Sequence, residues 1–298
     1  MRIVYAGLPA GAVSLRARGH EIVAALVAGR DRSGVGRLRR TLGMAGAPVF
    51  VDPDLADEEV RHLVASPKAD ALVSFFWPRR IPPEALALFE VRLGAHPSLL
   101  PRHRGADPIF WTILKGDVTT GVSIHDLAPE MDGGDVRLQI ERPVGPDATG
   151  GSLWRDLRRV ALDAMAEVLQ AYDRGAPPPG LRQDGSLATE APTPTDDDLE
   201  IRWRAPADEI LRLVRAASPD PGAFTEVAGR TLTILSAAPT KRRLDPGDAV
   251  LLPEGVCIGT GTEAIVLVAV GSGGATAKGP AVAGLFPVLS DFRSSERE

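Results

Sequence analysis

The feature that most constrains this chain is an alternation of short apolar runs with helical stretches through its first half. The continuous apolar runs predict buried strands, and the spacing of apolar residues between them predicts helices. Strands that alternate with helices indicate a parallel sheet covered on both faces. We expect strands at 2–6, 21–27, 48–51, 69–75, 91–96, 122–125 and 136–140, and helices at 54–65, 83–89, 107–115 and 151–171.

The composition changes after this region. Residues 175–198 are rich in Pro, Gly, Asp and Thr, as is typical of a linker. One helix is expected at 206–217, and the short apolar runs that follow, separated by Gly and Pro, predict a small β-barrel. We therefore expect a catalytic domain over residues 1–175, a linker over 176–200 and a β-barrel domain over 201–298.

Composition excludes several classes of protein. The chain has 298 residues, of which 44% are apolar and 24% charged, so disorder throughout is excluded. No apolar run approaches the roughly 20 residues of a membrane helix, and the first residues lack a signal-peptide pattern. Cys257 is the only cysteine, and the net charge is −5. We expect a cytoplasmic protein without a metal, a membrane contact or a global attraction to nucleic acid.

The candidate chemistry lies at the end of the expected strand 91–96. No phosphate-binding loop, dinucleotide fingerprint or hydrolase elbow is present. His96 ends this strand, and sites in open parallel sheets form at the carboxyl ends of strands. Asp132 lies in the segment MDGGD, where paired glycines allow a close approach of the backbone. The pattern predicts a His96–Asp132 acid–base pair, with an ordinary turn histidine as the alternative.

These stretches resemble the family of formyltransferases that use 10-formyltetrahydrofolate. The family pattern N-x-H-x-S-L-L-P-x-x-R-G is matched by GAHPSLLPRHRG at 94–105, G-D-x-x-T-G-V by GDVTTGV at 116–122, and [LM]-D-x-G by MDGG at 131–134. The resemblance covers nearly the whole chain. It implies an α/β fold in which a Rossmann-like parallel sheet forms the N-terminal formyltransferase domain and a small β-barrel follows it.

The resemblance also implies which residues are catalytic. The family His and Asp correspond to His96 and Asp132, whereas the family Asn is replaced by Gly94, and the chain has no asparagine at all. His96 would relay the proton of an attacking amine, and Asp132 would hold His96. Because the family's amide donor to the developing oxyanion is missing, Gly94→Asn would recover part of the rate if the enzyme is merely weakened. We expect instead that Asn crowds an acceptor or a water in that space and lowers activity. A folate-binding or acceptor-binding protein with impaired catalysis is the alternative of another class.

The resemblance implies 10-formyltetrahydrofolate as co-substrate, with its pterin between two backbone segments at 75–81 and 127–132. Apolar contacts and backbone amides in these segments would bind the flat ring. Core packing is the alternative for the aromatic residues. The expected binding residues are Phe76, Trp77, Arg79, Ile81, Leu127 and Gly133.

The acceptor is expected to be a small-molecule amine, either an amino sugar nucleotide or an amino-acid derivative. The segment DPIFW at 107–111 is similar to the sugar-nucleotide branch of the family, and we expect Arg104 and Trp111 to bind substrate. Methionyl-tRNA formyltransferase is the alternative, and tRNA is the less favoured partner. A short basic cluster could contact phosphates of either acceptor, and it contains Arg30, Arg32, Arg37, Arg39 and Arg40.

Overall fold

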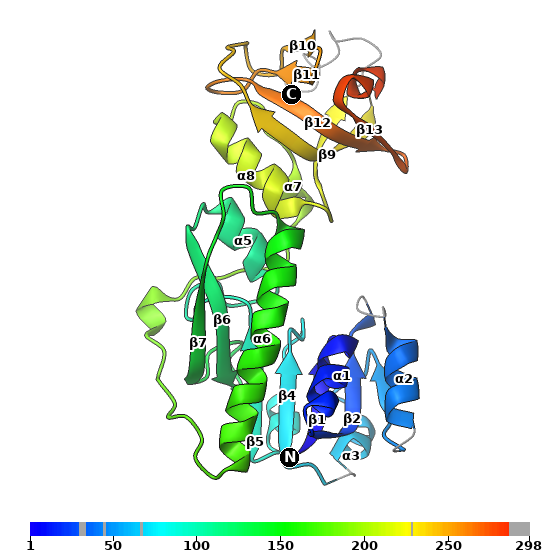
Figure 1. Cartoon of the computed structure of the whole chain (residues 1–298), viewed down its shortest axis with the longest axis vertical. Helices are drawn as coiled ribbons and strands as arrows, with labels where there is room; N and C mark the ends of the chain where they lie inside the picture. The colour runs from blue at the N-terminus through cyan, green and yellow to red at the C-terminus, as the bar shows by residue number, and fades with distance from the viewer. Residues whose placement is uncertain (30–33, 44–45, 66–67, 228, 286–298) are drawn as a thin grey trace. The chain divides into compact units, whose positions relative to one another are not determined.

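The computed structural model describes residues 1–29, 34–43, 46–65, 68–227 and 229–285 (Figure 1). The chain divides into two compact units that alternate along the sequence. The first unit comprises Met1–Pro108, Thr119–Pro143 and Arg155–Pro192, and the second comprises Ile109–Val118, Val144–Trp154 and the chain from Thr193 onward. The domain boundaries at 175 and 200 expected from composition stay a prediction.

A seven-stranded sheet forms the centre of the first unit, in the order β3-β2-β1-β4-β5-β6-β7. β1 to β5 are parallel, as predicted, whereas β6 and β7 are antiparallel to their neighbours. The short loop between β6 and β7 has no crossover helix, so these two strands must run in opposite directions. The strands are β1 (Arg2–Gly7), β2 (Glu21–Val27), β3 (Val49–Val51), β4 (Ala71–Phe75), β5 (Val91–His96), β6 (Thr119–Asp126) and β7 (Val136–Pro143).

The central strands are apolar on both faces, as the continuous runs predict. All five residues of β4 are buried, and Tyr5 and Phe75 are among the largest fully buried side chains. α4 ends at Leu86, so it is shorter than the helix expected over 83–89. The helices of this part of the chain are α1 (Pro9–Ala17), α2 (Val35–Gly43), α3 (Glu58–Ala65), α4 (Pro83–Leu86) and α6 (Gly150–Asp173), the last of which begins in the second unit.

The second unit contains a six-stranded antiparallel sheet with the path β10-β11-β12-β9-β8, and β13 pairs with β12. α8 (Ala207–Ala217) buries the apolar face formed by Ile210, Leu213 and Val214. α5 (Pro108–Leu114) and α7 (Asp196–Leu199) precede it. The strands are β8 (Ala223–Val227), β9 (Arg230–Pro239), β10 (Ala249–Leu252), β11 (Gly255–Ile258), β12 (Ile265–Ser272) and β13 (Ala275–Lys278).

Much of the segment expected to be a linker packs against the first unit. Leu181 exchanges two backbone hydrogen bonds with Val136. The backbone N–H of Arg104 donates to the Thr189 carbonyl, and the Arg104 carbonyl accepts from the Ala191 N–H. These contacts bring residues 181–191 back beside the loops that follow β5 and β6. Within the described part of the chain, no helix is long and apolar enough to span a membrane.

Candidate functional site

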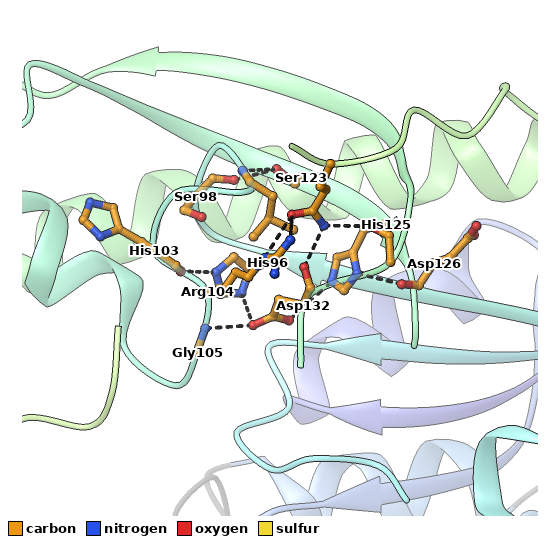
Figure 2. Close-up of polar contacts among 12 residues, drawn as sticks. His96, Ser98, His103, Arg104, Gly105, Ser123, His125, Asp126 and Asp132 are labelled. Atoms are coloured by element: carbon orange, nitrogen blue, oxygen red, sulfur yellow. Dashed lines mark hydrogen bonds and ion pairs between the residues drawn. The ribbon is translucent and has the colours of Figure 1, made fainter. Parts of the chain in front are cut away.

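His96 is the last residue of β5, and its imidazole is buried (Figure 2). Its Nε2 lies 2.7 Å from the carbonyl oxygen of His103. Because a carbonyl can only accept, Nε2 carries the hydrogen and Nδ1 is left to face the site. This Nδ1 lies 3.4 Å from Oδ2 of Asp132, so the structure brings the predicted pair together.

Asp132 lies in the loop between β6 and β7, with its side chain 14% exposed. Its backbone has a φ of 54°, in the left-handed region that non-glycine residues seldom adopt. The N–H of Gly105 donates to Oδ2 over 2.9 Å. A Cβ on Gly134 would lie 1.9 Å from the carbonyl oxygen of Asp126, so the close return of this loop requires glycine there. Gly134 therefore shapes the loop that carries the carboxylate, whereas the approach of the glycine backbone to a ligand stays a prediction.

A second histidine, His125, meets the same carboxylate and was missed from the sequence. β6 pairs with β5 so that His125 lies opposite Gly94. Its side chain is 2% exposed, its Nε2 lies 3.5 Å from Oδ1 of Asp132, and its Nδ1 donates to the carbonyl of Asp126 over 2.9 Å. The two imidazoles are nearly perpendicular, with ring centres 6.5 Å apart. Only the register of the two strands reveals this neighbour.

Gly94 leaves the space that the His125 ring fills. A Cβ at this position would lie 2.6 Å from Nε2 and 2.9 Å from Cε1 of His125, and 2.9 Å from Leu127. Contacts this short would displace the imidazole or the leucine. A side chain at this position would therefore crowd His125 and Leu127, whereas the crowding of an acceptor or a water that the sequence suggests stays a prediction.

Burial lowers the pKa of His125, and the positive field of His96 acts in the same direction, whereas Asp132 raises the pKa. The neutral ring carries its hydrogen on Nδ1, toward the Asp126 carbonyl. Nε2 then presents a lone pair to Asp132, as the Nδ1 of a neutral His96 does from the other side. Asp132 thus lies between two ring nitrogens, with His96 Nδ1 near Oδ2 and His125 Nε2 near Oδ1.

A hydrogen-bond network fixes the turn after His96. The Ser123 hydroxyl donates to the Ser98 carbonyl over 2.7 Å and accepts from the Leu100 N–H over 3.0 Å. Gln139 donates both to this hydroxyl and to the Leu100 carbonyl. The loop at 97–105 is thereby tied to β6 and β7, which also carry His125 and the Asp132 loop.

Gln183, from the segment expected to be a linker, supports the carboxylate loop. Its Nε2 donates to the carbonyl oxygens of Asp132 and Gly134 over 2.7 and 2.6 Å. Its Oε1 accepts from Arg104, which also forms an ion pair with Glu130 at 2.7 Å. Arg104, expected to bind substrate, is thus already engaged by protein groups around the site.

Trp111, the other residue expected to bind substrate, belongs to the second unit. Its ring meets Phe110 edge to face at 5.3 Å, and the Lys115 ammonium lies 5.6 Å from its centre. The structure therefore does not bring Trp111 and the His96 site together within one unit, and its role stays a prediction.

The two segments expected to bind the pterin lie side by side. Arg80 Nε donates to the Pro129 carbonyl over 2.8 Å, and Trp77, Ile81 and Leu127 belong to one apolar cluster. Phe76, at a φ of 55°, stacks on Phe75. Gly133 donates its N–H to the Glu130 carbonyl within the second segment.

A cavity of about 460 Å³ adjoins the first of these segments. Trp77, Arg79 and Asp52 line it, with the Arg79 guanidinium 4.5 Å from the centre of the Trp77 ring. The Trp77 Nε1 is buried without a hydrogen-bond partner among the described residues.

The predicted basic cluster is partly described. Arg37, Arg39 and Arg40 are exposed on α2, which has no acidic residue. Arg30 and Arg32 lie outside the described residues.

Comparison with known proteins identifies both parts of the chain. Residues 10–169 match the family described as formyl transferase, and residues 195–282 match its C-terminal domain. The methionyl-tRNA formyltransferase of Anaeromyxobacter dehalogenans is 37% identical over 285 residues, covering 90% of this chain and 91% of the relative. That of a Roseiflexus species is 33% identical, covering 91% and 87%.

Solved structures share the fold. HypX from Aquifex aeolicus in complex with tetrahydrofolic acid aligns with a TM-score of 0.66 at 23% identity, over 91% of this chain and 47% of HypX. The Helicobacter canadensis N-formyltransferase, solved with folinic acid and dTDP-3-aminofucose, aligns with a TM-score of 0.68 at 14% identity, over 89% and 98%. These matches confirm the predicted family and fold: the chain belongs to the formyl transferase family and is a formyltransferase.

Proposed function

We propose that this enzyme transfers a formyl group from 10-formyltetrahydrofolate to the amine of methionyl-tRNA. The observation that carries this choice of acceptor is the pair of relatives named methionyl-tRNA formyltransferase, which align along nearly the full length of both chains. These names favour the alternative acceptor over the small-molecule amine expected from the sequence.

The site supplies the groups that formyl transfer needs. The amine nitrogen attacks the formyl carbon, negative charge develops on the formyl oxygen, and the amine must lose a proton. His96, beside Asp132, is the group proposed to take that proton and to return it to the departing folate nitrogen. Burial of both groups limits exchange with water during these steps.

The folate is proposed to bind along the paired segments at 76–81 and 127–133. Trp77, Ile81 and Leu127 offer apolar surface, and Phe76 and Gly133 offer backbone groups at the same edge of the sheet. Arg79 beside the 460 Å³ cavity is proposed to meet a carboxylate of the folate. Arg104, held by Gln183 and Glu130, is proposed to face the acceptor.

The exposed arginines of α2 support a polyanionic acceptor. Arg37, Arg39 and Arg40 are exposed on a helix that itself carries no acidic residue, so their side chains are placed to meet phosphates. A sugar nucleotide carries only two phosphates and needs fewer such contacts. The proposed tRNA contact therefore predicts a steep dependence of transfer on salt.

The test is a competition between acceptors. Purified enzyme is incubated with 10-formyltetrahydrofolate and either methionyl-tRNA or a dTDP-linked amino sugar, and the formylated product is identified by mass. We expect formylated methionyl-tRNA, at a rate that falls with salt and falls further in an Arg37/Arg39/Arg40→Ala variant. Formylation of the amino sugar alone would overturn the proposed acceptor, and formylation of neither would overturn both candidates.

A further inference from the structure

We propose that His125 is a positioning residue of this active centre, which acts through Asp132 and whose imidazole is admitted by the missing side chain at Gly94. The proposal rests on the proposed function, because it assigns a role in the same formyl transfer. It adds a residue that the sequence pattern did not single out. The geometry of three side chains carries it.

The His125 imidazole lies in space that a side chain at Gly94 would occupy. The two residues lie directly opposite each other on β5 and β6, and a Cβ on Gly94 would come within 2.6 Å of His125 Nε2. The backbone of Gly94 does not adopt the positive φ that favours glycine, so the lack of space for a side chain, and not the backbone conformation, favours glycine here. The polar atom that occupies this space belongs to His125.

Two imidazole rings contact Asp132 in the same way, one at each carboxylate oxygen. His96 and His125 each donate from one ring nitrogen to a backbone carbonyl, over 2.7 and 2.9 Å. Each turns its other nitrogen to a different oxygen of Asp132, at 3.4 and 3.5 Å. Figure 2 shows the carboxylate between the two rings. An imidazole that served only to fill the core would not need an oriented nitrogen facing a carboxylate.

The charged groups around His125 include one carboxylate that lies beside its Nε2. The ionisable groups that act on it are Asp132, His96 and Asp126. Asp126 is paired with Arg137 at 2.7 Å, so its charge is largely compensated. Asp132 is therefore the carboxylate that Nε2 of His125 faces, at 3.5 Å. A neutral His125 gives that carboxylate no hydrogen, so its Nε2 can accept one from that side of the site.

This arrangement suits the proton transfer of the reaction. As the amine nitrogen bonds to the formyl carbon, an N–H bond of the amine breaks and the proton passes to the Asp132–His96 pair, where His125 Nε2 can share it. As the bond from the formyl carbon to the folate nitrogen breaks, the same proton passes to that nitrogen. No proton is gained or lost overall. His125 stabilises the proton once it has arrived, because its Nε2 lone pair lies 3.5 Å from Oδ1 of Asp132.

The first test replaces the lone pair on His125 Nε2 by a hydrogen-bond donor. His125→Gln places an amide N–H near Asp132, which stabilises the carboxylate and weakens the base. We expect the acidic limb of the pH profile of kcat/KM to move to lower pH by about one unit, and kcat to fall about tenfold, with the same acceptor throughout. His20→Gln is the matched control, because His20 is a buried histidine that directly precedes β2 and lies beside Asp173, and its replacement should leave the profile unchanged. An unmoved profile in His125→Gln would overturn the proposal.

The second test uses the contact with Gly94. Gly94→Ala should displace the imidazole and lower kcat/KM by about tenfold, whereas the same change in a His125→Ala background should cost clearly less, since only the contact with Leu127 remains. Equal losses in both backgrounds would show that Gly94 acts independently of His125. Thermal unfolding of each variant separates these effects from a loss of folding.

A third readout needs no substrate. The ¹⁵N chemical shifts of the imidazole should show His125 neutral with its hydrogen on Nδ1 at neutral pH, and Asp132→Asn should change them. A doubly protonated ring, or shifts indifferent to Asp132→Asn, would contradict the proposal even if formyl transfer is confirmed. If the enzyme transfers no formyl group but these shifts are as expected, the proposed function fails and the geometry of the trio stands.

Discussion

At the scale of single residues, the account depends on His96 and Asp132 acting as a unit. His96→Ala should lower kcat/KM by about 10² to 10⁴-fold, as for a lost general acid–base group. Asp132→Asn should cause a large share of the same loss, because it keeps the shape but removes the charge beside His96 Nδ1. The double variant should be little worse than His96→Ala. Steady-state rates at saturating folate measure this, and a purely structural pair would leave both single variants at the wild-type rate.

The sequence could predict this pair but not its third member. His96 ends a recognisable strand and Asp132 lies in a glycine-rich turn, so both carry local signals. His125 carries none, because it looks like any residue of a short strand. Its proximity to Asp132 follows from the register between β5 and β6, which depends on tertiary pairing that the chain's local pattern does not encode.

At the scale of elements, the segment at 181–191 holds the carboxylate loop in place. Gln183→Ala removes donors to the carbonyls of Asp132 and Gly134 and frees Arg104. We expect kcat to fall about tenfold, since a small displacement of a catalytic group is costly, with a smaller effect on global stability. The matched control is Gln170→Ala on the exposed face of α6. If Gln183→Ala and Gln170→Ala both retain full kcat, the segment has no part in positioning Asp132.

The prediction of helices and strands succeeded where the pattern of apolar residues is strong. It failed where long-range contacts determine the direction of a strand or the path of a loop. The buried strands β1, β2, β4 and β5 follow from continuous apolar runs, and all four are found. The antiparallel direction of β6 and β7 was not predicted, because an apolar run does not reveal strand direction. The ordered path of residues 181–191 was hidden by Pro and Gly, which indicate a loop but not whether the loop packs.

At the scale of the whole molecule, buried histidines should make folding sensitive to acid. Burial lowers the pKa of His20 and of His125 in the folded chain, whereas an unfolded histidine has a pKa of about 6.5. The unfolded chain therefore binds more protons below this pH, and the free energy of unfolding falls as the pH drops. The stabilisation is fully present above about pH 6.5.

The thermal midpoint should accordingly fall between about pH 7.5 and 5.5, and His20→Gln should reduce this fall. His62→Gln is the control, because the His62 side chain is 77% exposed and should not change the pH dependence. A pH dependence that is identical in all three proteins would assign the acid sensitivity to other groups.

The most direct test of the central claim is the ratio of tetrahydrofolate released to formylated acceptor formed, measured by absorbance and mass in one reaction. The account predicts one-to-one stoichiometry with methionyl-tRNA, dependence on the acceptor, and a loss of both products of at least about 100-fold in Asp132→Asn. Release of tetrahydrofolate without acceptor, or unchanged rates in that variant, would contradict formyl transfer at the His96–Asp132 centre.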